Sequence, residues 1–339
     1  MVRDKIAVLG FGSSGQRFAS LVSQRLPGAE LLVYSSQRLT GETFYSTSNL
    51  SEVRKFKPTV AIVCGVASDR LAMVKALPKE MRGVLIEKPL AINYEDGIRV
   101  TDELAQRGGV TQVGYNLRFS PSLREFKRKV DSLRFGRVFS VRAETGQYLP
   151  DWRTGRDYRN TASARGESGG GVLRELSHEI DYLRWVFGDI EWVSAWCGKQ
   201  SDLEIDVEDT AHLTMGFSRE AASPMLVGQL NLDFTRHDRT RSITAVCAEG
   251  TLRWDGITLR VEEWSRGGAE WEVSYAEEAL ALTSYERQWD SFYSTMTKGA
   301  TPKVTVEDGL AVLSVIDSAR SSYDLEGIRV SPSRTGPVS

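Results

Sequence analysis

Residues 5–15 read KIAVLGFGSSG, a short apolar run followed at once by glycines in the spacing G-x-G-x-x-G. The run 5–9 is typical of a strand buried on both faces of a parallel sheet. Apolar side chains recur at helical spacing in residues 16–25, so a helix is expected after the turn. In that context the turn places backbone N–H groups where dinucleotide phosphates bind. We therefore expect a dinucleotide to bind at Gly10, Gly12, Ser13, Ser14 and Gly15.

Each glycine has a separate part in this prediction. Gly10 permits a tight turn, Gly12 lets the backbone approach a phosphate, and Gly15 lets the helix pack closely on the strand. A glycine pattern of this kind also arises by chance in loops, so its position between a strand and a helix matters more than its letters.

Strands and helices alternate over the rest of the N-terminal half. The apolar patterns predict strands at 30–34, 59–64, 83–86 and 110–114, and helices at 70–77 and 94–107. This alternation indicates an α/β fold, a Rossmann doubly wound parallel sheet that occupies residues 1–119.

Longer alternating runs follow residue 120 and predict antiparallel strands. They lie at 138–145, 210–217, 225–234, 242–249 and 251–254. We expect a C-terminal α/β domain with a large open, mainly antiparallel sheet in residues 120–330, which binds substrate and supports oligomerisation. Residues 331–339 are expected to form a loose tail.

Composition excludes several classes of protein. The chain has 43 basic and 45 acidic residues, well mixed along its length, so no basic stripe predicts nucleic-acid binding. Its three cysteines form no C-x-x-C pair, so we expect no disulfide framework and no metal site. The first residues lack a signal-peptide pattern, and no window approaches about 18 apolar residues. We expect a soluble, cytoplasmic protein with no membrane partner.

The end of the second strand bears on the choice of cofactor. An acidic residue at this point normally binds the adenosine ribose 2′-hydroxyl of NAD. The sequence has Ser35, Ser36 and Arg38 instead, two hydroxyls and a cation that suit a 2′-phosphate. We expect NADP(H) to be favoured, with NAD(H) as the alternative and Arg38 as a plain surface charge if NAD(H) is bound.

Two further segments carry candidate chemical groups. Glu87-Lys88-Pro89 follows a strand, where Lys88 is placed to hydrogen-bond or protonate a carbonyl oxygen, although a solvated lysine at a strand end is the simpler interpretation. In residues 169–183 a helical wheel sets an apolar stripe opposite His178 and Asp181. An aspartate at this spacing can hold an imidazole, the side chain best suited to exchanging a proton near neutral pH.

Taken together, these motifs resemble the Gfo/Idh/MocA oxidoreductases. The resemblance rests on the glycine turn, on residues 87–89 and 114–119, and on GGG-x-L followed by H-x-x-D at 178–181. It implies hydride transfer to or from a carbon of a sugar, inositol or sugar nucleotide. The residues that it implies as catalytic are Lys88, His178 and Asp181, with Glu87, Lys88 and Asn116 at the cofactor and Arg118 at the substrate.

The chain departs from the family pattern at two places. Relatives often carry an acid four residues before the histidine, where this chain has Arg174, with Glu175 one residue later. The loop at residues 65–70 lacks the proline and histidine common in relatives, so its cofactor contacts do not carry over.

The loop at residues 148–159 is rich in aromatic and basic side chains. Tyr148, Trp152, Arg153 and Tyr158 are candidates to contact an acidic or nucleotide-linked sugar, and a subunit-contact loop is an equal alternative. An exposed open sheet would suit a homo-oligomer, a dimer or a tetramer.

Two alternative functions stay open at this point. One is a non-catalytic, nucleotide-sensing regulator of the same fold, and the joint presence of Lys88, His178 and Asp181 argues against it. The other is a methyltransferase, in which the segment at residues 87–89 would have no role.

Overall fold

The computed structural model describes residues 4–37, 39, 44–153, 155–218, 224–278 and 283–333. It divides into two compact units. The first unit comprises Met1–Tyr115 and Gln288–Leu313, and the second comprises Asn116–Arg287 and Ser314–Ser339. The chain thus passes to the second unit a few residues before the predicted boundary. It also returns to the first unit within the segment 120–330 that was predicted to be one domain. Within the described residues, no helix is long and apolar enough to cross a membrane.

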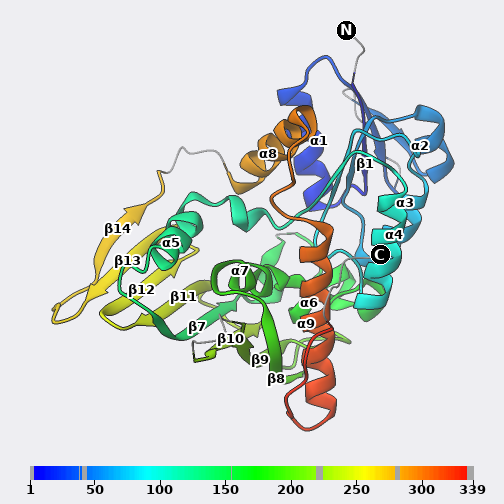
Figure 1. Ribbon diagram of the computed structural model, residues 1–339. Coiled ribbons are helices and arrows are strands. Elements are labelled where there is room, and N and C mark those ends of the chain that lie inside the picture. Colours follow the sequence, from blue (N-terminus) through cyan, green and yellow to red (C-terminus); the bar gives the residue numbers. More distant parts are fainter. Residues whose placement is uncertain are drawn as a thin grey trace. The chain divides into compact units, whose positions relative to one another are not determined.

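A parallel sheet forms the centre of the first unit (Figure 1). Its strands pair in the order β3-β2-β1-β4-β5-β6, and every pair is parallel. Each residue of β4 and β5 is buried, as expected of strands covered on both faces. The bounds are β1 Lys5–Leu9, β2 Glu30–Tyr34, β3 Tyr45–Thr47, β4 Val60–Val63, β5 Gly83–Ile86 and β6 Val110–Val113.

Helices cover this sheet on both sides. Their bounds are α1 Ser13–Arg25, α2 Leu50–Phe56, η1 Ala67–Asp69, α3 Arg70–Lys75, α4 Tyr94–Ala105 and α8 Ser284–Lys298, of which the last enters the unit at Gln288. An ion pair of 3.4 Å between Arg25 and Asp290 joins α1 to α8. Side chains cap the N-termini of α2 and α4. Asn49 accepts a hydrogen bond from the N–H of Ser51 at the start of α2, and Asn93 accepts one from the N–H of Asp96 at the start of α4.

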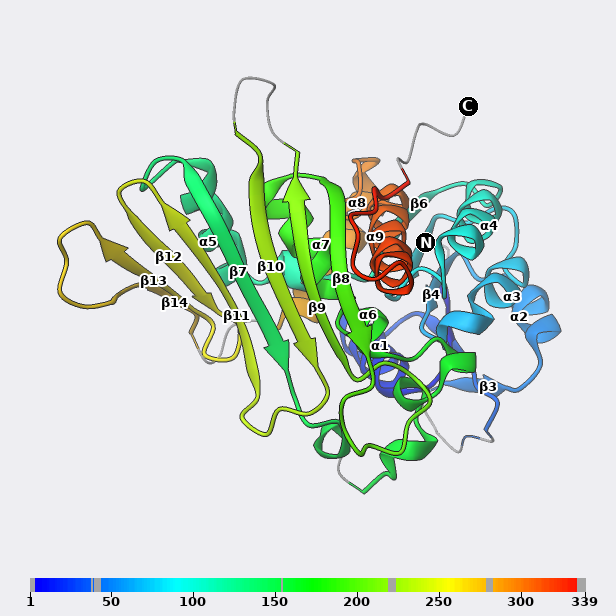
Figure 2. The ribbon, with the colours of Figure 1, turned by 90° about the horizontal axis from the view of Figure 1, so that it is seen from below.

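The sheet of the second unit is larger, and Figure 2 shows its strands side by side from β14 to β8. Their order is β14-β13-β12-β11-β7-β10-β9-β8, antiparallel except for the parallel pair β7 and β10. The prediction of a mainly antiparallel sheet is confirmed. The bounds are β7 Val138–Gly146, β8 Ile190–Gly198, β9 Thr210–Phe217, β10 Leu226–Asp233, β11 Thr240–Cys247, β12 Gly250–Asp255, β13 Arg260–Ser265 and β14 Glu272–Ala276.

One face of this sheet is covered by helices, and aromatic side chains form much of the contact. Phe187 packs against Phe126 at 6.3 Å and against Phe217 at 5.9 Å between ring centres. The opposite face exposes apolar side chains, among them Trp196 at 36% and Val227 at 39%. The helices are η2 Asn116–Phe119, α5 Pro121–Asp131, α6 Val172–Glu175, α7 Ser177–Phe187 and the end of α9 Val306–Asp324. Short 3-10 turns lie at η3 Leu149–Trp152, η4 Tyr158–Asn160, η5 Ala162–Ala164 and η6 Gly166–Ser168.

Candidate active site

The glycine turn between β1 and α1 is held by close backbone packing. Gly10 has φ +100°, and its N–H donates to the carbonyl of Tyr34 at the end of β2 (2.9 Å). A Cβ on Gly10 would lie 2.5 Å from the backbone nitrogen of Gly65, and one on Gly15 would lie 1.9 Å from the carbonyl oxygen of Gly10. These two positions therefore require glycine for the fold itself.

Gly12 differs from its neighbours, since a Cβ built on it would meet no described atom within 4 Å. Gly12 is the N-cap of the 13-residue helix α1, whose first turn contains no acidic residue. The first N–H groups of a helix have no acceptor within the helix, and its N-terminus favours negative charge. The open space and the donors of Ser13, Ser14 and Gly15 fit the pyrophosphate of a dinucleotide.

The other predicted cofactor residues of the first unit end neighbouring strands at the same edge. Because β2, β1, β4 and β5 are adjacent and parallel, residues 35–36, the glycine turn, Gly65 and Lys88 all follow strands at the carboxyl edge of the sheet. This edge, where the strand order reverses, is where open α/β sheets bind ligands. The Oγ of Ser35 accepts from the N–H of Gln37 (3.1 Å), and Ser36 is exposed. Arg38 lies outside the described residues.

Glu87 is buried at the end of β5, with 4% of its surface exposed. Its Oε2 accepts from the N–H of Lys88 (3.1 Å). Burial raises the pKa of the Glu87 carboxyl, and the nearby charges of Lys88 and Arg70 oppose the shift. The carboxyl also packs on Gly114, where a Cβ would lie 3.0 Å from Oε2. Glu87 thus holds the Lys88 backbone through its carboxyl, which is itself packed against Gly114.

The raised pKa of Glu87 makes a pH-dependent prediction. A carboxyl whose pKa is raised by folding contributes stability below its unfolded pKa, about 4.3, and loses that contribution as pH rises through the folded pKa. Glu87→Gln keeps an acceptor for the Lys88 N–H but cannot ionise. We expect its thermal midpoint to equal that of the wild type near pH 4 and to exceed it increasingly above that pH.

Glu125→Gln is a matched control of opposite sign. A hydrogen bond from Arg128 holds the pKa of Glu125 below its usual value. The wild type gains stability from this carboxylate as pH rises, so Glu125→Gln should become less stable than the wild type over the same range. Parallel pH profiles for wild type and Glu87→Gln, measured by calorimetry from pH 4 to 8, would contradict the expected desolvation of Glu87.

The helix that carries His178 and Asp181 differs from the prediction. The expected continuous helix breaks at Leu176 (φ −98°, ψ 30°), between α6 and α7. His178 is 9% exposed and Asp181 only 1% exposed, so neither lies on the solvated face that the helical wheel predicted. His178 and Asp181 lie on the same helix, α7, as Ile180 and Leu183, and residues 177–183 are all buried, so this part of the helix is covered on its polar face as well as on its apolar stripe.

Asp181 forms a two-bond ion pair with Arg118, which is itself buried. Nε of Arg118 donates to Oδ2 (2.9 Å), and Nη2 donates to Oδ1 (2.7 Å). This geometry directs the Arg118 fork at a carboxylate of the protein, whereas the sequence suggested a substrate contact. Asn116, predicted at the cofactor, is 4% exposed, and its Nδ2 donates to Ser284 Oγ (2.6 Å).

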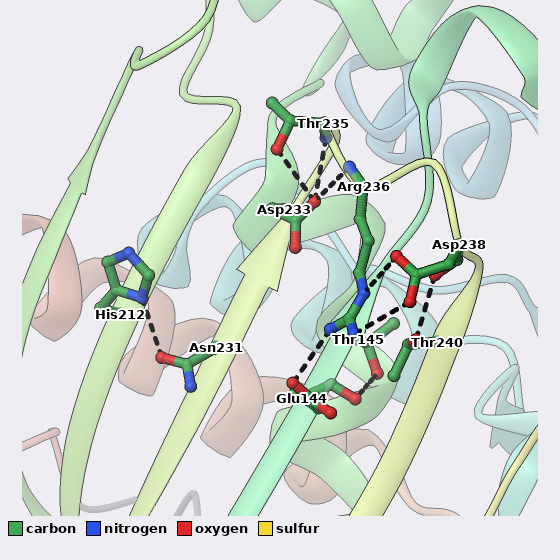
Figure 3. A network of polar contacts seen from close by, with 9 residues as sticks. All are labelled: Glu144, Thr145, His212, Asn231, Asp233, Thr235, Arg236, Asp238 and Thr240. Atoms are coloured by element: carbon green, nitrogen blue, oxygen red, sulfur yellow. Dashed lines mark hydrogen bonds and ion pairs between the residues drawn. The ribbon is translucent and has the colours of Figure 1, made fainter.

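The two remaining histidines lie in other surroundings. His212 stands on β9 and pairs with Asn231 of β10 (2.8 Å), as Figure 3 shows. His237 packs on Tyr148 at 4.4 Å between ring centres. Figure 3 also shows Arg236 between Glu144 (3.0 Å) and Asp238 (2.9 Å). His178 therefore differs from both in lying on a buried helix.

The loop at residues 148–159 is pinned to the second sheet. Trp152 donates from Nε1 to the carbonyl of Gln147 (3.0 Å) and packs edge-on against Phe234. Trp152, Arg153 and Tyr158 line one small hollow, whereas Tyr148 stacks on His237 and is not part of its lining. The structure thus brings together three of the four substrate residues predicted in this loop.

Arg174 and Glu175, at the first of the two departures from the family pattern, bind residues that precede α6. Glu175 Oε1 accepts from Ser163 Oγ (2.9 Å), and Arg174 Nη1 donates to the carbonyl of Gly170 (3.0 Å). Burial lowers the pKa of Arg174 to about 10. Both side chains hold residues 163–170 in place.

Two arginines with structural contacts, the buried Arg70 and the half-buried Arg241, were not assigned a role from the sequence patterns considered above. Arg241 pairs with Glu179, which is fully buried beside His178, at 2.8 Å. Arg70 binds the loop that contains Lys88. In the sequence, Arg70 can be noticed only as a cation at the end of the loop at residues 65–70, which departs from the family pattern. Among the described residues no group of three His, Cys, Asp or Glu side chains could hold a metal ion.

The fold and its glycine turn define a Rossmann-type dinucleotide-binding protein with a second, sheet-based unit. A family model described as an oxidoreductase family with an NAD-binding Rossmann fold matches residues 5–115, and the GFO/IDH/MocA C-terminal domain matches residues 123–253. Together they match well over half of the chain. The chain belongs to the Gfo/Idh/MocA family of oxidoreductases.

Several relatives carry names for polyol and sugar dehydrogenases. Inositol 2-dehydrogenase of Gluconacetobacter diazotrophicus is 26% identical over 56% of this chain, and the match spans 56% of that protein. Myo-inositol 2-dehydrogenase of Thermotoga maritima is 24% identical over 78% of this chain and 77% of its own length. Inositol 2-dehydrogenase 2 of Saccharopolyspora erythraea is 38% identical over 39% of this chain and 36% of its own.

Solved structures show the same fold over nearly the whole chain. Levoglucosan dehydrogenase in complex with NADH has a TM-score of 0.83 at 18% identity and covers 98% of this chain and 100% of its own. The WlbA dehydrogenase of Bordetella pertussis, in complex with NADH and UDP-GlcNAcA, has a TM-score of 0.79 at 20% identity and covers 98% and 99%.

Proposed function

We propose that this protein is an NAD(P)-dependent dehydrogenase or reductase that acts on a CH–OH or C=O group of a sugar, an inositol or a sugar nucleotide. One observation carries the proposal: the glycine turn after β1 and the Glu87-Lys88 loop after β5 lie on either side of β4, at the carboxyl edge of one parallel sheet. The names of the relatives, inositol, xylose and levoglucosan dehydrogenases, support the substrate class.

The chemistry divides between a cofactor and the side chains of this chain. A bound nicotinamide dinucleotide supplies the hydride donor or acceptor. Lys88 hydrogen-bonds the reacting oxygen of the substrate, and His178 exchanges the proton of that oxygen with solvent. Asp181 keeps the His178 helix in place through its pair with Arg118, and we assign Arg118 to that role in preference to substrate contact.

Of the two nicotinamide cofactors, we favour NADP(H) over NAD(H). Ser35, Ser36 and Arg38 follow β2 and offer hydroxyls and a cation to a 2′-phosphate, with no acid in their place. Structures of relatives with NADH keep NAD(H) as the alternative.

Thermal-shift titration tests the cofactor directly. A ligand that binds only the folded state at 100 times its Kd stabilises it by about 2.7 kcal/mol. We expect NADP⁺ and NADPH to raise the thermal midpoint at lower concentrations than NAD⁺ and NADH. A shift with NAD⁺ alone would reverse the preference, and no shift with any of the four would contradict dinucleotide binding.

The substrate and assembly follow from the second unit. Trp152, Arg153 and Tyr158, with Tyr148 nearby in sequence, offer aromatic faces and a cation suited to a sugar that carries an acidic group. Its open sheet face, with Trp196 and Val227 exposed, suits a dimer or tetramer. The three cysteines are free thiols, which suits a cytoplasmic setting. Turnover with a panel of inositols, aldoses, acidic sugars and sugar nucleotides, followed by NADPH fluorescence, tests this class.

A further inference from the structure

Arg70 is a buried cation that the proposed chemistry does not use. It begins helix α3, directly after the loop that follows β4, and only 3% of its surface is exposed. Burial lowers the pKa of its guanidinium, as expected of a charge that is removed from water. A buried arginine of this kind needs partners that compensate for its lost hydration.

Those partners are main-chain carbonyls of two different loops. Nε donates to the carbonyl of Gly65 (2.9 Å), Nη1 to that of Glu87, and Nη2 to that of Lys88 (3.3 Å). The planar guanidinium fixes the directions of these donors relative to one another. Arg70 therefore joins the loop after β4 to Glu87 and Lys88 after β5, of which Lys88 carries the proposed chemistry.

This arrangement restrains the Lys88 backbone from a second side. The N–H of Lys88 is bound by the carboxyl of Glu87, while its carbonyl is bound by Arg70. A lysine side chain has many rotamers, so a fixed backbone limits the positions that its ammonium group can reach. Geometry within about half an ångström is what such a group needs in order to act.

We propose that Arg70 is the positioning residue of Lys88, holding the backbone of residues 87–88 by its guanidinium fork. The inference rests on the proposed function of Lys88 for its effect on turnover, but not for its effect on the loop. Arg70 acts through Lys88 and touches no reacting atom.

Arg107 offers a matched control in the same unit. It is 4% exposed, and it also donates to main-chain carbonyls, those of Val74 (3.1 Å) and Glu103 (3.1 Å). The residues that it binds lie in α3 and α4 and not in the Lys88 loop. Arg107→Gln therefore removes a buried arginine fork without releasing residues 87–88.

The test compares Arg70→Gln, Arg70→Lys and Arg107→Gln in the full chain. Hydrogen–deuterium exchange of peptides that cover residues 87–92 reports on the loop without any substrate. We expect Arg70→Gln to speed exchange there at least tenfold, Arg70→Lys to speed it less because one ammonium replaces part of the fork, and Arg107→Gln to leave it unchanged. Should Arg70→Gln fail to fold, Arg70→Lys carries the same comparison.

Turnover and NADPH binding complete the experiment. Arg70→Gln should lower kcat by 10- to 100-fold with little change in KM, and Arg70→Lys should restore part of it. Wild-type exchange at residues 87–92 in Arg70→Gln, or equal loosening in Arg107→Gln, would overturn the inference. If Lys88→Ala kept full turnover while Arg70→Gln loosened the loop, the role of Lys88 would be wrong and the positioning by Arg70 would stand.

Discussion

Gly15→Ala is expected to destabilise the first unit by about 3 kcal/mol or more and to abolish dinucleotide binding. The new Cβ would lie 1.9 Å from the carbonyl oxygen of Gly10 and 2.9 Å from its carbon. Both are backbone atoms of the turn, so no side chain can rotate away to relieve the overlap. Calorimetry measures the first effect, and NADPH fluorescence titration measures the second.

Gly12→Ala is the matched variant within the same turn. No described atom lies within 4 Å of the place that its new Cβ would take, so the stability should stay within the usual range of surface substitutions, about ±0.5 kcal/mol. NADPH affinity should nevertheless fall by about 100-fold, equivalent to about 2.7 kcal/mol, because the methyl group occupies the space assigned to phosphate. Equal affinity in Gly12→Ala and wild type would place the pyrophosphate elsewhere.

Lys88→Ala is expected to lower turnover by about 10²- to 10⁴-fold, the usual contribution of a positioned acid or base. Its backbone contacts, to Glu87 and Arg70, involve main-chain atoms and survive the substitution. Cofactor affinity should therefore change far less than kcat. Steady-state kinetics with NADPH, together with the binding titration, separate the two effects.

His178→Ala should show a related loss, and two substitutions check the assignment. Lys88→Arg keeps the charge but removes a group able to give up its proton, so it should not restore turnover. Lys75→Ala, on the exposed side of α3, should leave turnover unchanged. Lys88→Ala and His178→Ala proteins that bind cofactor and keep full turnover would reject both assigned roles.

Local patterns predicted much of the first unit correctly. The strands at 30–34 and 83–86 have the predicted bounds, and so does the strand at 210–217 in the second unit. Buried parallel strands are short apolar runs between turn residues, so their signal lies within the segment itself. The same holds for the glycine turn, whose expected function follows from its position between a strand and a helix.

Features that depend on contacts between distant segments were not predictable in this way. Asp181 is buried against Arg118, 63 positions earlier in the chain, and the helical wheel of residues 169–183 did not show that His178 is buried on the same helix. Arg70 gave no local signal of its contact with Glu87 and Lys88 across two loops. These contacts join residues that lie far apart in the sequence. This distance along the chain, and not the weakness of any single motif, limited the prediction of the site.

The return of residues 288–313 to the first unit affects how this protein folds as it is made. Val304 accepts the N–H of Val113 (3.1 Å), Phe292 packs where a Cβ on Gly83 would lie, and Leu310 does the same at Gly97. A ribosome adds roughly 170 residues between Tyr115 and Gln288, which takes roughly 10 to 30 s at about 5–20 residues per second. We expect the apolar surfaces of β5 and α4 that these residues cover to stay exposed through that interval, in which the nascent chain is open to chaperones.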